Sequence, residues 1–246
     1  MSKRGLKRGV SSSRWDMTTE RSLLSESRTE ALVNKRQRMA KPEKFWDRSA
    51  SMYDGSEPSS DPTHIKTVET AKKYLDVSDV VLDYGCATGT IALEIAGQVK
   101  AVHGIDISSK MIEAAKRKAG ERKVENADFA QATIFDERLK KEAFDVILAF
   151  NVLHLLEDPR KAVQRMNELL RPGGSIISST ACMGENRASF MSVLLFLVMK
   201  IGIIPSLKFF TVAELEDAIA SGNFQIVETE SLTRNPTSYL VVAKKI

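Results

Sequence analysis

The sequence predicts an α/β fold, built on a doubly wound, mostly parallel sheet of seven strands with helices on both faces. From Met39 onward, apolar strand-like runs alternate with helix-like segments, an order typical of parallel strands joined by crossover helices. The run 143–150 is apolar almost throughout, as expected for a strand covered on both faces. The last two strand-like runs have no helix between them, so one strand near the C-terminus is expected to be antiparallel.

Turn and cap signals separate the elements. A Pro in the first turn favours a helix that begins at Pro159, and Thr211 with Glu214 forms the pattern of a capping box. Gly120 and Gly222 are expected to end their helices, because glycine accepts the left-handed conformation that follows a helix. We expect strands at 79–84, 101–106, 127–132, 143–150, 175–180, 224–232 and 238–246, and helices at 61–75, 90–98, 108–120, 158–170 and 211–222.

The positive charge of the chain lies in its first residues. The formal net charge is +4 at pH 7, but residues 1–38 carry ten Lys/Arg and four Asp/Glu, which leaves −2 for residues 39–246. A domain so close to neutral gives no electrostatic reason to expect a nucleic-acid partner. We expect residues 1–38 to be a basic, disordered extension of a single domain at 39–246. The alternative is a targeting peptide, which would make the protein organellar.

The cysteines and histidines show no metal-ligand spacing. Cys86 and Cys182 are far apart and unaccompanied, which favours a reducing compartment over a disulfide scaffold, and hence the cytoplasm. The three histidines are scattered. The longest apolar run, 193–199, is far below the roughly 18–20 residues that a membrane-spanning helix needs.

The segment VLDYGCATGT (81–90) places two glycines directly after an apolar strand. Glycine is favoured where the backbone needs a positive φ or where a ligand approaches closely. A dinucleotide-binding turn has the pattern G-x-G-x-x-G, whereas Gly85 and Gly89 are four residues apart with Ala87 between them. Asp83, just before the glycines, would repel a pyrophosphate and attract an ammonium or a sulfonium. The turn therefore predicts a ligand that carries a positive charge.

This turn resembles the first motif of class I S-adenosylmethionine-dependent methyltransferases, roughly D-x-G-x-G-x-G, with Ala87 in place of the middle glycine. The resemblance covers about residues 43–246 and is to the small-molecule type. It implies a Rossmann-like fold, an enzyme that transfers methyl groups, and the cofactor S-adenosyl-L-methionine. Further matches are FWDRSASMYD (45–54), an N-terminal lid, FDVILAFNVLHLLEDP, the fourth-strand motif, and LLRPGG before the fifth strand.

The resemblance also implies roles for individual residues. Asp106 would bind the ribose hydroxyls, and Ile107 would pack on the adenine. Thr133 stands where the family usually has the acid that reads the adenine edge. The full set of implied cofactor-binding residues is Tyr53, Asp83, Gly85, Ala87, Gly89, Asp106, Ile107, Ala132, Thr133, Asn151 and Val152.

Two features bear on the methyl acceptor. His154 is the only histidine expected at the carboxyl end of a strand near the site, which makes it our candidate for a general base; the alternative is a structural histidine. The segment 189–210 is strongly apolar. With the lid helices at 39–75, a cap at 185–210 would enclose a small, apolar or amphipathic acceptor, and it could also contact a membrane surface.

Two other functions stay open at this stage. One is a non-catalytic domain that binds the cofactor or a protein partner. The other is a protein or RNA methyltransferase anchored by the basic extension. The sequence does not indicate an oligomeric state.

Overall fold

The computed structural model describes residues 42–55, 61–184, 207–233 and 237–246, all within one compact unit, Lys41–Ile246. The basic extension at 1–38 and most of the apolar cap at 185–210 lie outside the described residues. None of the described helices is both long and apolar enough to cross a membrane.

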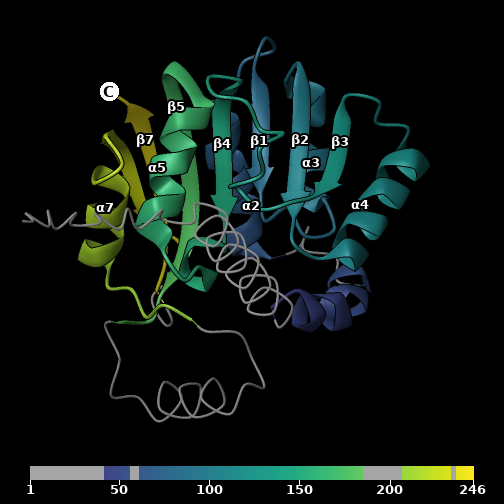
Figure 1. The fold of residues 1–246 in the computed structure, drawn as a ribbon, viewed down its shortest axis with the longest axis horizontal. Coiled ribbons are helices and arrows are strands. Elements are labelled where there is room, and N and C mark those ends of the chain that lie inside the picture. Colours follow the sequence, from purple (N-terminus) through teal and green to yellow (C-terminus); the bar gives the residue numbers. More distant parts are fainter. Residues whose placement is uncertain (1–41, 56–60, 185–206, 234–236) are drawn as a thin grey trace, which may run out of the picture. The chain divides into compact units, whose positions relative to one another are not determined.

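The sheet has seven strands in the order β3-β2-β1-β4-β5-β7-β6 (Figure 1). Strands β1 to β5 run parallel, and β7 is antiparallel to both of its neighbours. The predicted mixed sheet is thereby confirmed, including its antiparallel strand near the C-terminus. The strands are β1 (Val80–Tyr84), β2 (Ala101–Asp106), β3 (Ala127–Gln131), β4 (Phe144–Phe150), β5 (Leu170–Cys182), β6 (Phe224–Ser231) and β7 (Thr237–Lys245).

Helices cover both faces of this sheet. In Figure 1, α5 and α7 lie in front of it, and α2 and α3 lie behind it. Residues 42–55 are also helical. The other described helices are α2 (Pro62–Lys72), α3 (Thr90–Ile95), α4 (Ser109–Arg122), α5 (Pro159–Leu169) and α7 (Val212–Ala220), with short 3-10 turns at Ala96–Gln98 and Leu153–Leu155.

The helix ends show which sequence signals were sufficient. The capping box of α7 is present in both directions, with Thr211 accepting from the Glu214 amide and Glu214 accepting from the Thr211 amide. The prediction for Gly120 was wrong, because α4 continues past it to Arg122. Lys123 takes the left-handed conformation there, with φ of 54°, so the glycine was not needed to end the helix.

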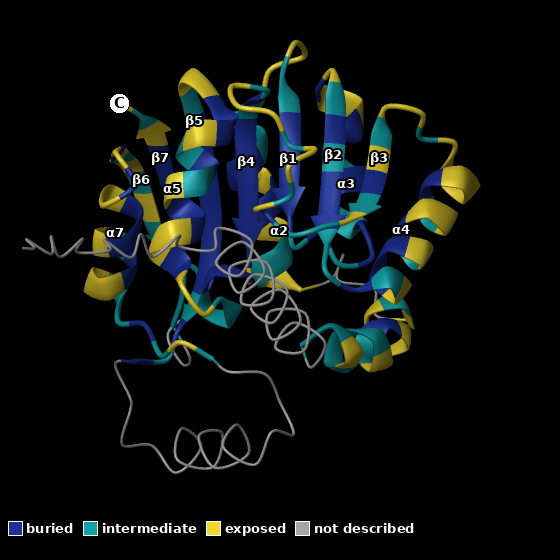
Figure 2. Cartoon of the chain, viewed as in Figure 1, coloured by how far each residue is buried: buried dark blue, intermediate teal, exposed yellow. Residues whose placement is uncertain are grey.

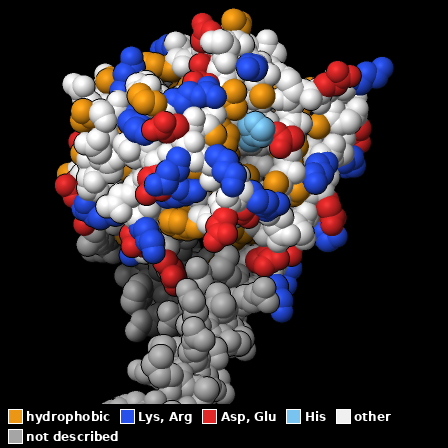
Figure 3. All heavy atoms as spheres, turned by 45° about the horizontal axis from the view of Figure 1, so that its top comes forward, with side chains coloured by type: hydrophobic (Ala, Val, Ile, Leu, Met, Phe, Trp, Pro, Cys, Tyr) orange, Lys and Arg blue, Asp and Glu red, His pale blue; other side chains and the backbone are white. Residues whose placement is uncertain are grey.

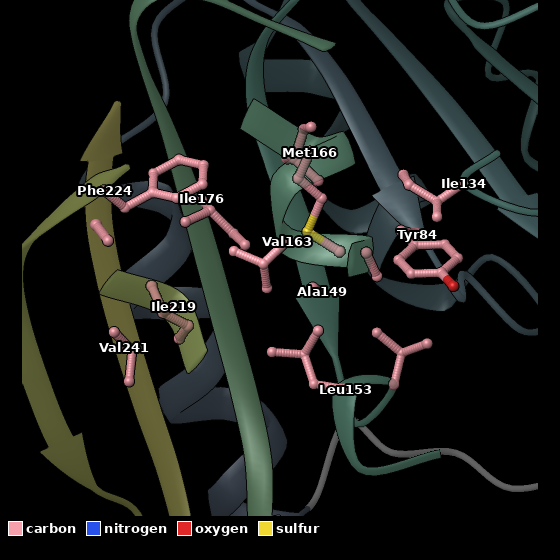
Figure 4. Packing of buried hydrophobic residues seen from close by; sticks show 14 of the residues in the cluster. Tyr84, Ile134, Ala149, Leu153, Val163, Met166, Ile176, Ile219, Phe224 and Val241 are labelled. Carbon is pink, nitrogen blue, oxygen red and sulfur yellow. The ribbon is translucent and has the colours of Figure 1, made fainter. Parts of the chain in front are cut away.

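The core consists of two apolar clusters, one on each face of the sheet. Figure 4 shows the cluster under α5 and α7, where Val163, Met166 and Ile219 point toward Ile176 and Val241 of the strands. The second cluster packs α2, α3 and α4 against the opposite face. Figure 2 shows that the central strands β1, β4 and β5 are buried over most of their length. Because helices cover both faces of the sheet, a ligand site is expected at the carboxyl ends of the strands.

Gly104 of β2 allows the closest approach in the second cluster, and we expect Gly104→Ala to destabilise the protein by about 1–3 kcal/mol. An added Cβ would lie 2.5 Å from the Phe129 ring and 3.0 Å from the Cys86 sulfur. Urea unfolding measures the effect. Gly120→Ala is the matched control, since its added Cβ meets nothing within 4 Å and alanine favours the helix. Equal stability of the two variants would contradict this packing argument.

Candidate functional site

A cavity of about 430 Å³ opens at the carboxyl ends of β1, β2 and β4. This is the edge of an open α/β sheet at which ligands bind. The strand ends contribute one wall, while α2 and the helical residues 42–55 contribute the other. The lining residues on the sheet side are Asp83, Tyr84, Gly85, Cys86, Ala87, Asp106, Ile107, Phe150, Asn151 and Val152.

The turn after β1 forms the floor of the cavity. Gly85 and Gly89 have φ of 77° and 74°, and Ala87 lies between them at 47°. A Cβ at Gly85 would come within 2.9 Å of Val152, so a side chain at that position would displace the wall made by β4. The positive φ at both positions therefore explains why glycine occupies them. Ala87 adopts the same left-handed region, at some cost for a residue with a Cβ.

Asp106, at the end of β2, is held by backbone amides on both of its carboxylate oxygens. The Ala87 amide donates to Oδ2 at 3.1 Å, and the Ser108 amide donates to Oδ1 at 2.8 Å. Burial raises the pKa of this carboxyl, although the two amides oppose the shift. Each oxygen retains accepting capacity, so the fixed carboxylate can receive two hydroxyl groups from a ligand in the cavity.

Asp83, at the end of β1, is only 3% exposed and lines the same cavity. Burial, and to a smaller extent the charge of the nearby Asp106, raise its pKa to about 7. An isolated buried carboxylate is unfavourable unless a cation accompanies it. A positively charged ligand group would supply that cation.

The two carboxyls together fit S-adenosylmethionine, which carries a ribose diol, an ammonium and a sulfonium. Asp106 would hold the diol, and Asp83 would face the positive charges. Ile107 and Met111 line the cavity beside them and supply apolar surface for a flat base. The turn, with positive φ at Gly85, Ala87 and Gly89, would let its backbone approach the ligand closely. A seven-stranded Rossmann-like sheet with this site defines a class I S-adenosylmethionine-dependent methyltransferase.

A family model described as a methyltransferase domain matches residues 75–225. The chain belongs to this family. Among curated proteins, it is 27% identical over 164 residues to a ubiquinone biosynthesis O-methyltransferase from Paracidovorax citrulli, covering 63% of this chain and 67% of that protein. The aligned part of this chain covers 67%, 61% and 45% of the length of three curated relatives that it matches.

Solved structures with the same fold include two from distant organisms. One comes from the complex between the Haloferax volcanii Trm112 methyltransferase activator and a methyltransferase, with a TM-score of 0.68, 17% identity, and coverage of 81% of this chain and 96% of that chain. The other is geranyl diphosphate C-methyltransferase from Streptomyces coelicolor, with S-adenosylhomocysteine bound. Its TM-score is 0.64 at 14% identity, over 74% of this chain and 79% of that chain.

Aromatic and leucine side chains also line the cavity. Trp46 and Tyr53, from the helical residues 42–55, lie edge to face with ring centroids 6.2 Å apart. They line the cavity together with Phe150, Leu155 and Leu156. Burial, and then the Asp106 charge, raise the pKa of Tyr53, which keeps its phenol protonated.

Four residues predicted for the site do not line this cavity. Gly89 is the N-cap of α3, where it contributes to the turn without lining the cavity. Ala132 lines a second cavity of about 310 Å³, beside Arg138. The Thr133 hydroxyl accepts from the Phe135 amide at 3.3 Å. These contacts give no support for the adenine contact predicted for the segment after β3, which stays a prediction.

His154 is the fourth of these residues, and the described residues give no support for its predicted role as a general base. It lies in the 3-10 turn after β4 and is not among the residues that line the cavity. Burial lowers the pKa of its ring to about 4, and Nδ1 is buried with no hydrogen-bond partner among the residues that the structure describes. Its neighbours Leu155 and Leu156 reach the cavity instead.

The sequence predicted lid helices at 39–75 but named no residue of α2 for the site. Asp61, Thr63, His64 and Thr67 all line the cavity. They come from the N-terminal part of one helix and follow the spacing of a helix face. The spacing alone could have shown a shared face, but only the packing of α2 beside the glycine turn shows that this face meets the cofactor cavity.

Acidic residues hold the helical residues 42–55 over the cavity. Asp47 accepts from the Ser108 hydroxyl at 2.7 Å and from the Lys110 amide at 3.2 Å, at the start of α4. Asp54 forms ion pairs with Arg117 and Lys118, farther along the same helix, at 2.6 and 3.2 Å. The lid is thus attached to α4 at two points, one of which is purely ionic.

We expect Asp54→Asn to raise the Kd for S-adenosylmethionine about two- to fivefold at low salt, because partly exposed ion pairs contribute modestly. The difference should shrink at high salt, which screens the same pairs in the unmodified protein. Calorimetric titration at two salt concentrations checks this. Glu113→Gln is the control, since Glu113 pairs with Lys110 within α4 and does not reach the lid. A salt-independent effect would contradict an ionic attachment.

Proposed function

We propose that this protein methylates a small molecule with an apolar or amphipathic body. The observation that carries the proposal is the set of large apolar side chains that line the cavity, namely Trp46, Phe150, Leu155 and Leu156. When bound, S-adenosylmethionine supplies a methyl group on a positively charged sulfur. The chain's own residues need to orient an acceptor and exclude water, which are the main requirements for this transfer.

Two further considerations support an apolar acceptor. Burial of apolar surface contributes about 25 cal/mol per Å², so such a wall favours a greasy body over a sugar. The relative from Paracidovorax citrulli is named a ubiquinone biosynthesis O-methyltransferase, which is a precedent for methylation in the biosynthesis of a small molecule. The apolar segment 189–210 has the composition of a cap, although it lies largely outside the described residues.

A panel of acceptors tests the proposal, with release of S-adenosylhomocysteine as the readout. Pairs of molecules with the same reacting group, one on an aromatic or alkyl body and one on a hydrophilic body, should differ at least tenfold in kcat/KM in favour of the apolar member. Turnover confined to the hydrophilic members would overturn the proposal. Binding of cofactor without turnover on any acceptor would instead favour a non-catalytic domain.

No observation favours a nucleic-acid substrate. On the face shown in Figure 3, basic and acidic side chains are interspersed and form no basic patch. The basic extension, residues 1–38, lies outside the described residues. Removing it should leave methylation of small molecules intact, whereas a protein or RNA methyltransferase anchored by the extension would lose activity.

A further inference from the structure

His64 is the histidine that lines the cofactor cavity within the described part of the chain. It lies in the first turn of α2, and its side chain is 10% exposed. His154 is buried outside this cavity, and His103 lines the second cavity. His64 therefore lines the cavity, as was expected of His154, but it comes from α2 and not from the end of a strand.

The ring of His64 is oriented by a carboxylate from the neighbouring helix. Its Nε2 lies 3.0 Å from Oε1 of Glu94 on α3. Because an ionised carboxylate only accepts hydrogen bonds, Nε2 must carry the proton that is shared. In the neutral ring, the lone pair is then on Nδ1, and no hydrogen bond to Nδ1 occurs among the described residues.

We propose that His64 is the general base for a hydroxyl acceptor, and that Glu94 is its positioning residue. This inference rests on the proposed function and specifies the acceptor atom as oxygen. The acceptor O–H donates its proton to Nδ1 while the oxygen forms the new bond to the methyl carbon. The bond from that carbon to sulfur breaks, and its electron pair stays on the sulfur. Glu94 stabilises the imidazolium until the proton passes to water.

An oxygen acceptor is the class for which such a base has a purpose. An alcohol or phenol is a weak nucleophile until it loses its proton, whereas a thiol with a pKa near 8.5 ionises readily by itself. General-base catalysis contributes typically about 10²–10⁴-fold. A histidine held in one tautomer by a carboxylate is the arrangement that serves this purpose in other enzyme classes.

The first test compares hydroxyl and thiol acceptors built on the same apolar body. His64→Gln in the full chain should lower kcat at least about 100-fold for the hydroxyl acceptor and less than about tenfold for the thiol. Glu94→Gln should lower it less, because the amide oxygen still accepts from Nε2 but carries no charge. The matched controls, His103→Gln and Asp128→Asn, remove another His–carboxylate pair, 2.6 Å apart, and should change neither rate.

A second measurement does not depend on activity. Nitrogen-15 NMR of the wild-type protein without ligand should show the neutral His64 ring protonated at Nε2 and unprotonated at Nδ1. The opposite tautomer would overturn the proposal even if a variant failed to fold. Calorimetry should find the affinity of His64→Gln for S-adenosylmethionine within about twofold of wild type; a larger loss would assign His64 to the cofactor instead.

The outcomes separate this inference from the function on which it rests. Wild-type protein that neither binds S-adenosylmethionine nor methylates any acceptor would overturn the proposed function. Wild-type turnover of a hydroxyl acceptor with an unaffected His64→Gln variant would overturn the general-base proposal alone. Equal losses with hydroxyl and thiol acceptors would also overturn it, since they would show that His64 only shapes the cavity.

Discussion

Asp106→Ala should bind S-adenosylmethionine at least about a hundredfold more weakly than wild type. The carboxylate is fixed by the Ala87 and Ser108 amides, so it accepts the ribose hydroxyls without reorganisation. Each hydrogen bond to a charged group contributes about 1.5–3 kcal/mol, and about 1.4 kcal/mol corresponds to a tenfold change in Kd. Two such bonds together account for the expected loss, which calorimetric titration measures directly.

The control for this variant is another aspartate that is distant from the cavity. Asp217 lies exposed on α7, where it pairs with Arg160, so Asp217→Ala should bind the cofactor as wild type does. Asp106→Asn retains one accepting oxygen and should lie between wild type and Asp106→Ala. A folded Asp106→Ala variant with unchanged affinity would exclude this carboxylate from the ribose site.

The free energy of unfolding of Asp83→Asn, relative to that of wild type, should increase as the pH rises. The variant should also bind the cofactor more weakly. The folded-state pKa of Asp83 is raised to about 7, above the ordinary value near 3.9 of an unfolded chain. Between these two values the native protein binds more protons than the unfolded chain, so wild type loses stability as pH increases. Over about three pH units, this loss is on the order of 4 kcal/mol, and asparagine does not undergo it.

Urea unfolding of both proteins at pH 4 and pH 8, without cofactor, gives the comparison. The stability difference, variant minus wild type, should move in favour of Asp83→Asn between the two values. Its affinity for S-adenosylmethionine at pH 8 should fall roughly tenfold or more, because the bond to the ammonium loses its charge. A difference in stability that is constant with pH would show that Asp83 ionises normally in the folded protein.

The sheet and the glycine turn could be predicted from the sequence because both depend on local rules. Alternation of strand-like and helix-like segments follows from side-chain periodicity, and Gly85 has a φ that favours glycine. The pairing of His64 with Glu94 could not be predicted, since these residues meet only because α2 packs beside α3. The same reason applies to Asp54, whose partners are 63 and 64 positions away.

The absence of His154 and Thr133 from the lining of the described cavity has a related cause. Motif resemblance gives the position of a residue along the chain but not the direction in which the backbone carries it after a strand ends. After β4, the chain forms a 3-10 turn that buries His154 and exposes Leu155 to the cavity. After β3, the Thr133 hydroxyl is used within its own turn.

The order of the strands has a consequence for how this chain folds. β7 lies between β5 and β6, and β6 pairs with no other strand of the sheet. Residues 224–231 therefore have no partner in the described sheet until residues 237–245 pair with them, and one edge of β5 stays exposed until the same event. Unpaired strand edges are prone to association with other chains. The arrival of residues 237–245 completes both pairings at once, so the amides of β6 should gain protection from hydrogen exchange together with those of β7, and not before.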